Sequence, residues 1–513
     1  MKSLEEVMQV WEPVIGLEVH VELTSLKTKL FCGCELEFGA EPNTHTCPVC
    51  LGLPGALPVP NKDAIKSIVL AGLATNCEIM KHSMFYRKSY MYPDMAKDFQ
   101  TTQGPIAFCM HGGVDLHIDG PCACERIDIP EAQGKNGSYT THIGITRLHL
   151  EEDAGKMIHI GGEDGRINGS THSLVDYNRA GTPLIELVTE PELHTPEEAR
   201  MFMQNLRQIY LALGISDCSM EQGSLRADGN ISLRRRGSTG LGTKTELKNI
   251  NSFKSLHDAL AYEIRRQAEV LEEGGTIYQE TRHWDPSTKH TIVMRTKETA
   301  DDYRLFPEPD LAPYDLTDEY IESVRAQLPE LPNAKAHRFE DSFGLSAYDA
   351  RHLIEHRVTA RFFEACMKHA DRSMAKPIAN FILNDLASKL NADDGFDLDS
   401  SFLTPERAVE LVGLIADDTI SSKQGKRVFE TLLTDDEDPQ AIVEKLGMKQ
   451  VSDTGAIEAV VDQVIADHPD KVAQYQGGKT GLLGFFVGQC MKAMHGQGNP
   501  KVINQLLSNK LNS

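Results

Sequence analysis

The sequence has no apolar run near the roughly 20 residues that a membrane-spanning helix needs, and its mean hydropathy is −0.33. The first residues lack the apolar core of a signal peptide and carry Glu5 and Glu6, which transit peptides avoid. Cysteine is scarce, with an odd total of 11 among 513 residues, and this excludes a disulfide framework. We therefore expect a cytoplasmic protein with reduced thiols.

The sequence is also poor in basic residues, with 52 Lys and Arg against 75 Asp and Glu and a net charge of −23. Such a balance argues on average against a polyanionic partner such as nucleic acid. Residues 471–513 are an exception, because they hold five lysines and no acidic residue, a side-chain charge of +5. If the protein binds nucleic acid, this tail is one place where we expect contact, through lysines that include Lys479 and Lys492.

The length predicts roughly three domains at about 150 residues each. Strand patterns separated by Gly and Pro fill residues 11 to about 295, and helical periodicity follows from about 315. Three prolines within 304–313 favour an extended connection between these parts. A helix start at Thr404-Pro405-Glu406 suggests a further break. We predict an α+β protein with domains at 1–300, 301–403 and 404–513, the last two all-α.

Four cysteines lie close together near the N-terminus, as Cys32-Gly33-Cys34 and Cys47-Pro48-Val49-Cys50. Two such pairs can supply four thiolates in tetrahedral geometry to Zn²⁺. The alternative is four buried free thiols, which their clustering beside Gly and Pro disfavours. Because four thiolates leave no open coordination position, we predict a structural zinc that holds an irregular loop.

A half-buried strand is predicted at 15–23, where apolar residues alternate with Glu18, His20 and Glu22. On an isolated strand these polar residues could simply face solvent. Two further strand-like runs add carboxylates, one ending at Glu151-Glu152-Asp153 and one interrupted by Glu186. A cation shared by four of these residues would explain why acids occur in apolar strands. We predict Mg²⁺ over Zn²⁺, although the histidine is unusual for Mg²⁺, with the ligands Glu18, His20, Glu152 and Glu186.

Two further segments carry polar or basic side chains suited to phosphates. Residues 224–233 alternate, and Arg226 lies on their polar face, which could handle phosphate or face solvent. Residues 86–94 interleave aromatic and basic side chains, as expected where bases stack and phosphates are neutralised. The residues singled out in this second segment are Arg87, Lys88, Tyr90 and Tyr92.

Long ungapped motifs along nearly the whole chain resemble the GatB family, the B subunits of tRNA-dependent amidotransferases. They include 14–23, 87–94, 149–156, 173–181, 221–231, 242–253 and 302–309. The tail is similar to YqeY-like domains at Gly488-Gln489-Cys490-Met491-Lys492. Phe99–Gln103 departs from the family's usual sequence, and so does Ala227 in the Arg-x-Asp segment. The resemblance implies a cradle-like, mostly antiparallel catalytic domain followed by helical and tRNA-binding tail domains.

The resemblance also implies a two-step reaction. ATP phosphorylates the side-chain carboxylate of Asp or Glu in mischarged Asp-tRNA(Asn) or Glu-tRNA(Gln), and ammonia then displaces the phosphate. In the family an amidase A subunit supplies the ammonia and a small C subunit completes a heterotrimer. The family's metal ligands match Glu18, His20, Glu152 and Glu186, and the expected cofactors are ATP, Mg²⁺ and structural Zn²⁺. This agrees with the lack of a Ser/Lys or Cys/His nucleophile signature in the sequence.

Three alternatives remain open on the sequence. The archaeal E subunit of a related Glu-tRNA amidotransferase shares the N-terminal motifs but normally carries an inserted domain, for which 513 residues leave no room. A non-catalytic zinc-stabilised RNA-binding protein would not explain the acids near Glu186. A free-standing metal hydrolase would hydrolyse ATP without tRNA.

Overall fold

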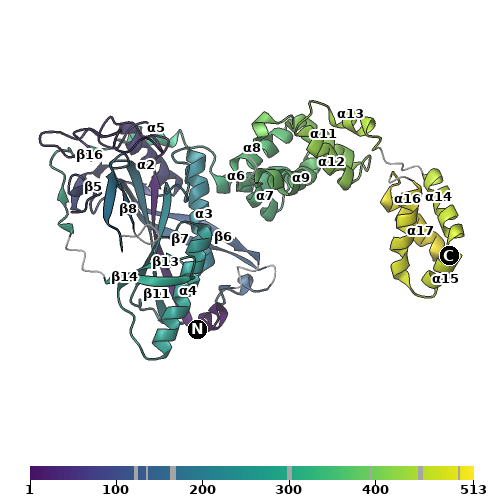
Figure 1. Ribbon diagram of the computed structural model, residues 1–513, viewed down its shortest axis with the longest axis horizontal. Coiled ribbons are helices and arrows are strands. Elements are labelled where there is room, and N and C mark those ends of the chain that lie inside the picture. The colour runs from purple at the N-terminus through teal and green to yellow at the C-terminus, as the bar shows by residue number, and fades with distance from the viewer. Residues whose placement is uncertain are drawn as a thin grey trace. The chain divides into compact units, whose positions relative to one another are not determined.

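The computed structural model describes residues 1–120, 125–134, 137–161, 169–296, 303–392, 396–448, 454–494 and 497–512. The chain divides into two compact units, Met1–Leu331 and Pro332–Ser513 (Figure 1). Mixed strands and helices form the first unit and helices form the second, which confirms the predicted α+β class. The finer division into three domains at 300 and 403 stays a prediction.

A nine-stranded sheet forms the centre of the first unit, in the order β14-β13-β12-β11-β1-β10-β7-β6-β2. Neighbouring strands are antiparallel except β12 and β13, which are parallel. The strands are β1 (Trp11–Glu22), β2 (Glu78–Ile79), β6 (Cys109–Asp119), β7 (Ser138–Glu152), β10 (Pro183–Thr189), β11 (Leu225–Arg235), β12 (Thr245–Lys248), β13 (Glu280–Asp285) and β14 (His290–Thr296).

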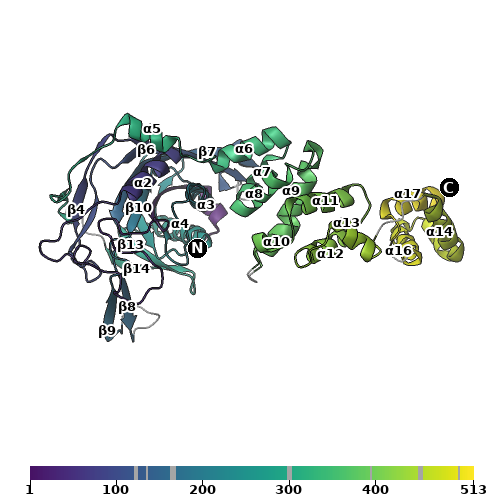
Figure 2. The same ribbon diagram turned by 90° about the horizontal axis from the view of Figure 1, so that it is seen from above.

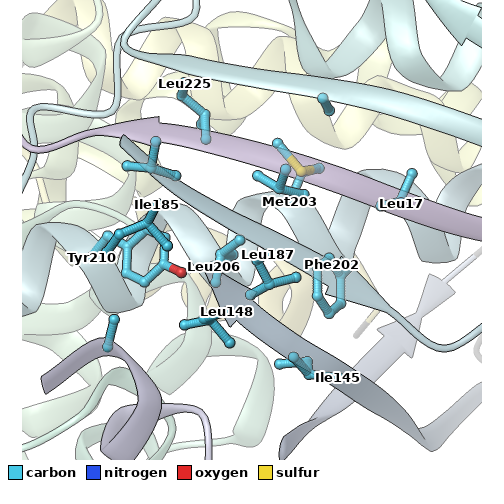
Figure 3. Packing of buried hydrophobic residues seen from close by; sticks show 14 of the residues in the cluster. Leu17, Ile145, Leu148, Ile185, Leu187, Phe202, Met203, Leu206, Tyr210 and Leu225 are labelled. Atoms are coloured by element: carbon cyan, nitrogen blue, oxygen red, sulfur yellow. The ribbon is translucent and has the colours of Figure 1, made fainter. Parts of the chain in front are cut away.

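Three helices cover one face of this sheet: α2 (Lys62–Ala74), α3 (Pro196–Leu213) and α4 (Phe253–Glu272). Each begins at a side-chain cap; Thr195, for example, accepts from the N–H of Glu198 ahead of a proline at the first helical position. Figure 3 shows the contact between the layers, where strand residues meet helix residues. The labelled side chains are Leu17, Ile145, Leu148, Ile185, Leu187 and Leu225 from strands, and Phe202, Met203, Leu206 and Tyr210 from α3. The helices pack on the apolar face and leave the polar face uncovered by them.

Smaller elements complete the first unit: α1 (Leu4–Met8), β4 (Phe85–Ser89) with β5 (Phe99–Gln103), and the hairpin of β8 (Lys156–Ile160) and β9 (His172–Asp176), which projects from the unit in Figure 2. The proline-rich segment is extended, as predicted. It adds β15 (Phe306–Pro307) to β4 and β16 (Tyr314–Asp315) to β3 (His82–Ser83), and α5 (Asp318–Arg325) then packs on α2. The segment therefore belongs to the first unit, which continues to Leu331.

The second unit contains two hydrophobic cores, one within 336–448 and one within 457–511. The predicted helix start at Thr404 is confirmed, because its hydroxyl accepts from the N–H of Arg407 and Pro405 is the first helical residue. The first core contains α6 (Pro332–Phe343), α7 (Ala347–Ile354), α8 (Arg357–Cys366), α9 (Ala375–Phe381), the π-helical turn η6 (Ile382–Leu386), α10 (Ala387–Leu390), α11 (Pro405–Ala416), α12 (Ser422–Leu432) and α13 (Pro439–Lys445). The second contains α14 (Thr454–Asp467), α15 (Pro469–Gln476), α16 (Leu483–Ala493) and α17 (Pro500–Leu511).

Within the described residues, no helix is long and apolar enough to cross a membrane.

Candidate functional site

The polar face of the sheet gathers side chains from five strands because antiparallel partners point to the same side. In β1, His20 lies opposite Glu186 of β10 and opposite Arg226 of β11. Glu18 lies opposite Asp228. The apolar residues between them face the helices, as the alternation in the sequence predicted. Strand register thus brings together residues that are more than 200 positions apart in the sequence.

The first cluster on this face consists of His20, Glu151 and Glu186, whose ligand atoms lie within 4.8 Å of one another. The His20 Nε2 to Glu186 Oε2 distance is 3.7 Å. The three residues come from β1, β7 and β10, the middle of the sheet. Two carboxylates and one imidazole converging on one point can hold a divalent cation.

A second cluster consists of Glu18, Asp228 and Glu246, also within 4.8 Å, from β1, β11 and β12. Asn230 Nδ2 donates to Glu18 at 2.9 Å, and Lys248 Nζ donates to Asp228 at 2.5 Å. Three carboxylates are the oxygen-rich ligand set that Mg²⁺ prefers. The polar face therefore holds two candidate cation sites where the sequence analysis expected one.

Burial and mutual charge shape the first cluster. Burial, together with the charge of Glu186, raises the pKa of Glu151 to about 7. Burial opposes ionisation of Glu186 as well, but the His20 imidazole 3.7 Å away outweighs burial and lowers the pKa of Glu186 to about 2. Burial lowers the pKa of nearby His149 to about 4. A bound divalent ion would compensate the buried charge of an ionised Glu151.

The two clusters open into one cavity of about 530 Å³. Cationic side chains line it beside the carboxylates: Lys88, Arg226 and Lys248. Tyr90, Asn249 and Tyr303 contribute further lining, and the Lys88 Nζ lies 4.8 Å from the Tyr303 ring centroid. A cavity with cation sites and basic groups on the same wall is suited to a phosphorylated ligand.

Glu152 lies elsewhere, which corrects the ligand set expected from the sequence. Its carboxylate is bonded to Lys97 Nζ and accepts from the N–H of Thr101 at 2.8 Å. The reason is that successive side chains of a strand point to opposite faces of the sheet. Glu152 is on the same face as buried Leu148 and Leu150, and so it points away from the polar face. Glu151 points to the opposite face, on which the cavity lies. Counting alternation from Leu148 in the sequence would have selected Glu151.

Arg87 and Lys88 are neighbours in β4, and their side chains also point to opposite faces because strand residues alternate. Lys88 lines the cavity, whereas Arg87 forms a bidentate pair with buried Glu308, at 2.7 and 2.8 Å, and bonds Asp310 at 2.9 Å. Arg87 therefore holds the proline-rich segment against β4. Tyr90 lines the cavity, and Tyr92, which is 52% exposed, lies beside it with ring centroids 5.7 Å apart.

Arg226 is held by a charge network around the buried Asp153, which the sequence analysis did not identify. Its Nη2 donates to Asp153 Oδ2 at 2.6 Å, and Arg179 Nε lies 3.8 Å from the same oxygen. Burial opposes ionisation of Asp153, but the two guanidinium groups outweigh it and lower the pKa. Burial and the charge of Asp153 raise the pKa of Glu22 to about 8. The network orients Arg226 beside the first cluster.

The four cysteines near the N-terminus, Cys32, Cys34, Cys47 and Cys50, form a cysteine knuckle and converge as predicted, with their sulfurs within 4.8 Å of one another. The Cys34–Cys50 and Cys47–Cys50 sulfur distances are 4.0 and 3.9 Å, close to the roughly 3.8 Å edge of a tetrahedral zinc site with Zn–S bonds of about 2.3 Å. Fully buried Lys29 places its Nζ 3.6 Å from Cys50 Sγ, where it offsets the negative charge of a thiolate set. A hydrogen bond from Cys32 outweighs burial and lowers the pKa of Cys50 to about 4. These residues fit a structural zinc.

In the tail, the predicted apolar stripe of α16 forms the core, with Phe486 and Cys490 buried. Lys479 and Lys492 are exposed. Lys510 is instead paired with Glu458 at 2.8 Å and Asp462 at 2.5 Å.

Comparisons with known proteins define the class. The sequence model of the GatB/GatE catalytic domain matches residues 13–322, and that of the GatB domain matches 361–511. The chain is 47% identical over 504 residues to the B subunit of the aspartyl/glutamyl-tRNA(Asn/Gln) amidotransferase of Carboxydothermus hydrogenoformans, covering 98% of this chain and 99% of the relative. The corresponding B subunits of Geobacter sp. strain M21 (47%, 98% of this chain and 99% of the relative) and Acaryochloris marina (46%, 98% of each) are similar over the same extent.

The chain belongs to the GatB family. The end-to-end match to these relatives favours this family over an archaeal E subunit and over a non-catalytic RNA-binding protein.

Proposed function

We propose that this chain is the catalytic member of a tRNA-dependent amidotransferase, acting in the cytoplasm. It would phosphorylate the side-chain carboxylate of Glu-tRNA(Gln), Asp-tRNA(Asn) or both with ATP, and then amidate it with ammonia. The observation that carries the proposal is the pair of carboxylate clusters beside three cationic side chains in one cavity. The names of the relatives, which share nearly the whole chain, support the same assignment.

The residues of the cavity suit phosphoryl transfer, which requires positioning and neutralisation of charge more than a protein nucleophile. The clusters around Glu186 and Asp228 would hold Mg²⁺. Bound Mg²⁺ would neutralise charge on the phosphates. Lys88, Arg226 and Lys248 would bind phosphate oxygens or the substrate carboxylate. The buried Asp153 would keep Arg226 oriented toward the reacting groups.

The partners follow from the same assignment. The sequence shows no nucleophile signature for glutamine hydrolysis, so an amidase A subunit would supply ammonia, and a small C subunit would complete the heterotrimer. The four-cysteine knuckle would hold a structural zinc, since its closed thiolate set offers no position for a substrate.

The test uses the reconstituted heterotrimer with mischarged tRNA, ATP, Mg²⁺ and ammonium chloride in place of glutamine. We expect formation of amidated aminoacyl-tRNA that requires both ATP and this chain. Assaying Glu-tRNA(Gln) and Asp-tRNA(Asn) separately would define the substrate. Amidation without ATP would contradict the proposal, and rapid ATP hydrolysis by the isolated chain without tRNA would support a free-standing hydrolase instead.

A further inference from the structure

Two cavities border the π-helical turn η6 in the second unit, far in sequence from the carboxylate clusters. One, of about 340 Å³, is lined by α9, η6, α11 and α12, and the other, of about 380 Å³, by α7, α9 and η6. They share Asn380 and Asn384. π-helical turns are rare in proteins and are frequently found at functional sites.

The lining of the first cavity suits a flat ring with polar edges. The apolar part of the lining comes from Phe381, Phe429 and Ile415. The two phenylalanine rings pack edge to face, with their centroids 5.2 Å apart. The side-chain amides of Asn380 and Asn384 add both hydrogen-bond donors and acceptors to this lining, and Asn384 Nδ2 already donates one hydrogen bond to the Asn380 carbonyl oxygen at 2.8 Å. The volume lies at the lower end for ligand sites, which suits one heterocyclic ring system.

The second cavity carries an exposed aromatic surface. Tyr348 is 58% exposed and stacks on His352, with ring centroids 4.0 Å apart and an angle of 33° between the ring planes. The His352 ring nitrogen Nδ1 lies 2.8 Å from the Tyr348 carbonyl oxygen, which fixes the imidazole beneath the phenol ring. An exposed aromatic ring of this kind can act as a stacking platform for a nucleobase.

Ammonium groups flank both cavities. Lys426 Nζ lies 3.3 Å from Asp385, and Lys376 Nζ lies 2.6 Å from Asp349; the two lysine side chains are 68% and 55% exposed. Each lysine is matched by one carboxylate, so this face has little excess charge. Recognition here would depend on stacking and on base edges, with the lysines close enough to contact neighbouring phosphates.

We propose that this face of the helical unit binds unstacked nucleotides of the tRNA substrate: one base enters the first cavity against Asn380 and Asn384, and a neighbouring base stacks on Tyr348. This inference rests on the proposed function for the identity of the RNA. It adds a base-recognition site to the tail lysines predicted from the sequence.

The test is equilibrium binding of tRNA transcripts to the full chain, comparing Tyr348→Ala and Asn384→Ala with two matched controls. Tyr348→Phe keeps the ring, and Gln440→Ala removes an exposed amide from α13 outside both cavities. We expect Kd to rise about 5- to 100-fold for Tyr348→Ala, as base stacking predicts, with Asn384→Ala also weakened and both controls within twofold of wild type. Affinities within twofold of wild type for both Tyr348→Ala and Asn384→Ala would overturn the inference.

A second measurement does not depend on variant folding. Photocrosslinking of 4-thiouridine-substituted tRNA to the unmodified full chain, mapped by mass spectrometry, should label peptides from 346–352 or 376–386. Crosslinks confined to other segments would contradict the proposal. Because neither experiment uses ATP, ammonia or the other two proteins of the heterotrimer, failure of amidation would not affect these results.

A free nucleotide could offer the same ring chemistry, and AMP distinguishes the two sources. Equilibrium dialysis of the full chain should show no difference in AMP binding between wild type and Asn384→Ala. Submillimolar AMP binding that Asn384→Ala abolishes, with unchanged tRNA affinity, would assign the cavity to a free nucleotide and overturn the tRNA proposal.

Discussion

Glu151 and Glu152 are adjacent in β7, yet their carboxylates lie on opposite faces of the sheet. Glu151 joins His20 and Glu186 on the cavity side, and Glu152 is bonded to Lys97 and the N–H of Thr101 on the other side. The pair offers a natural internal comparison, because the side chains are identical and their backbone positions are consecutive.

We predict that Glu151→Gln raises the Mg²⁺ concentration needed for half-maximal amidation by at least about 10-fold, because it removes one cation ligand. Glu152→Gln is the matched control and should leave the Mg²⁺ requirement unchanged, whatever it does to the overall rate. The measurement is a Mg²⁺ titration of ammonia-dependent amidation by the heterotrimer. A shift for Glu152→Gln without one for Glu151→Gln would show that the ligand assignment is wrong.

The Arg87–Glu308 pair predicts a stability effect. Glu308 is 4% exposed, so Arg87→Gln leaves a buried carboxylate without its bidentate partner. We expect a loss of about 3–5 kcal/mol in the free energy of unfolding of the first unit. Lys81→Gln breaks a pair in the same unit whose side chains are 63% and 72% exposed, and it should cost no more than about 1 kcal/mol. Urea unfolding measures both, and equal losses would refute a structural role for Arg87.

The cysteine knuckle predicts about one tightly bound zinc per chain. Elemental analysis of purified protein should detect it, and Cys50→Ser should lower the content strongly by removing one thiolate. Cys77→Ser is the control, since this buried cysteine of the same unit lies outside the knuckle. Wild-type protein purified without zinc supplementation or chelator and found free of zinc would rule out the site.

The tail predicts a salt-dependent effect on RNA binding. Replacing both Lys479 and Lys492 with alanine should weaken tRNA binding and reduce the slope of log K against log salt by about 1 to 2, if each lysine contacts one phosphate. Lys510→Ala should change little, because Glu458 and Asp462 already neutralise that ammonium group. Filter binding over a range of salt concentrations tests this, and an unchanged slope in the double variant would contradict phosphate contact.

Local signals in the sequence predicted local structure well. The alternation around Glu18 and His20 correctly predicted strand β1, and the Thr404-Pro405 pair correctly predicted where helix α11 begins. The clustering of the four cysteines could be predicted from their spacing, because both cysteine pairs lie within one short loop. In each case the residues that decide the structure are close together in the chain.

Features that depend on register between distant segments were not predicted. The cluster of Glu18, Asp228 and Glu246 exists because β11 pairs with both β1 and β12, and no local pattern specifies that register. Arg87 was expected to contact substrate, but its carboxylate partner lies 221 residues away.

The proposed mechanism requires the polar face of the sheet to hold two divalent cations at the transfer site. Manganese binding to the full chain, followed by electron paramagnetic resonance, tests this most directly, with Mn²⁺ standing in for Mg²⁺. We predict two Mn²⁺ per wild-type chain, with Glu186→Gln losing the ion of the first cluster and Asp228→Asn losing that of the second. An Mn²⁺ stoichiometry that is the same in wild type and in both variants would contradict the two-cation site.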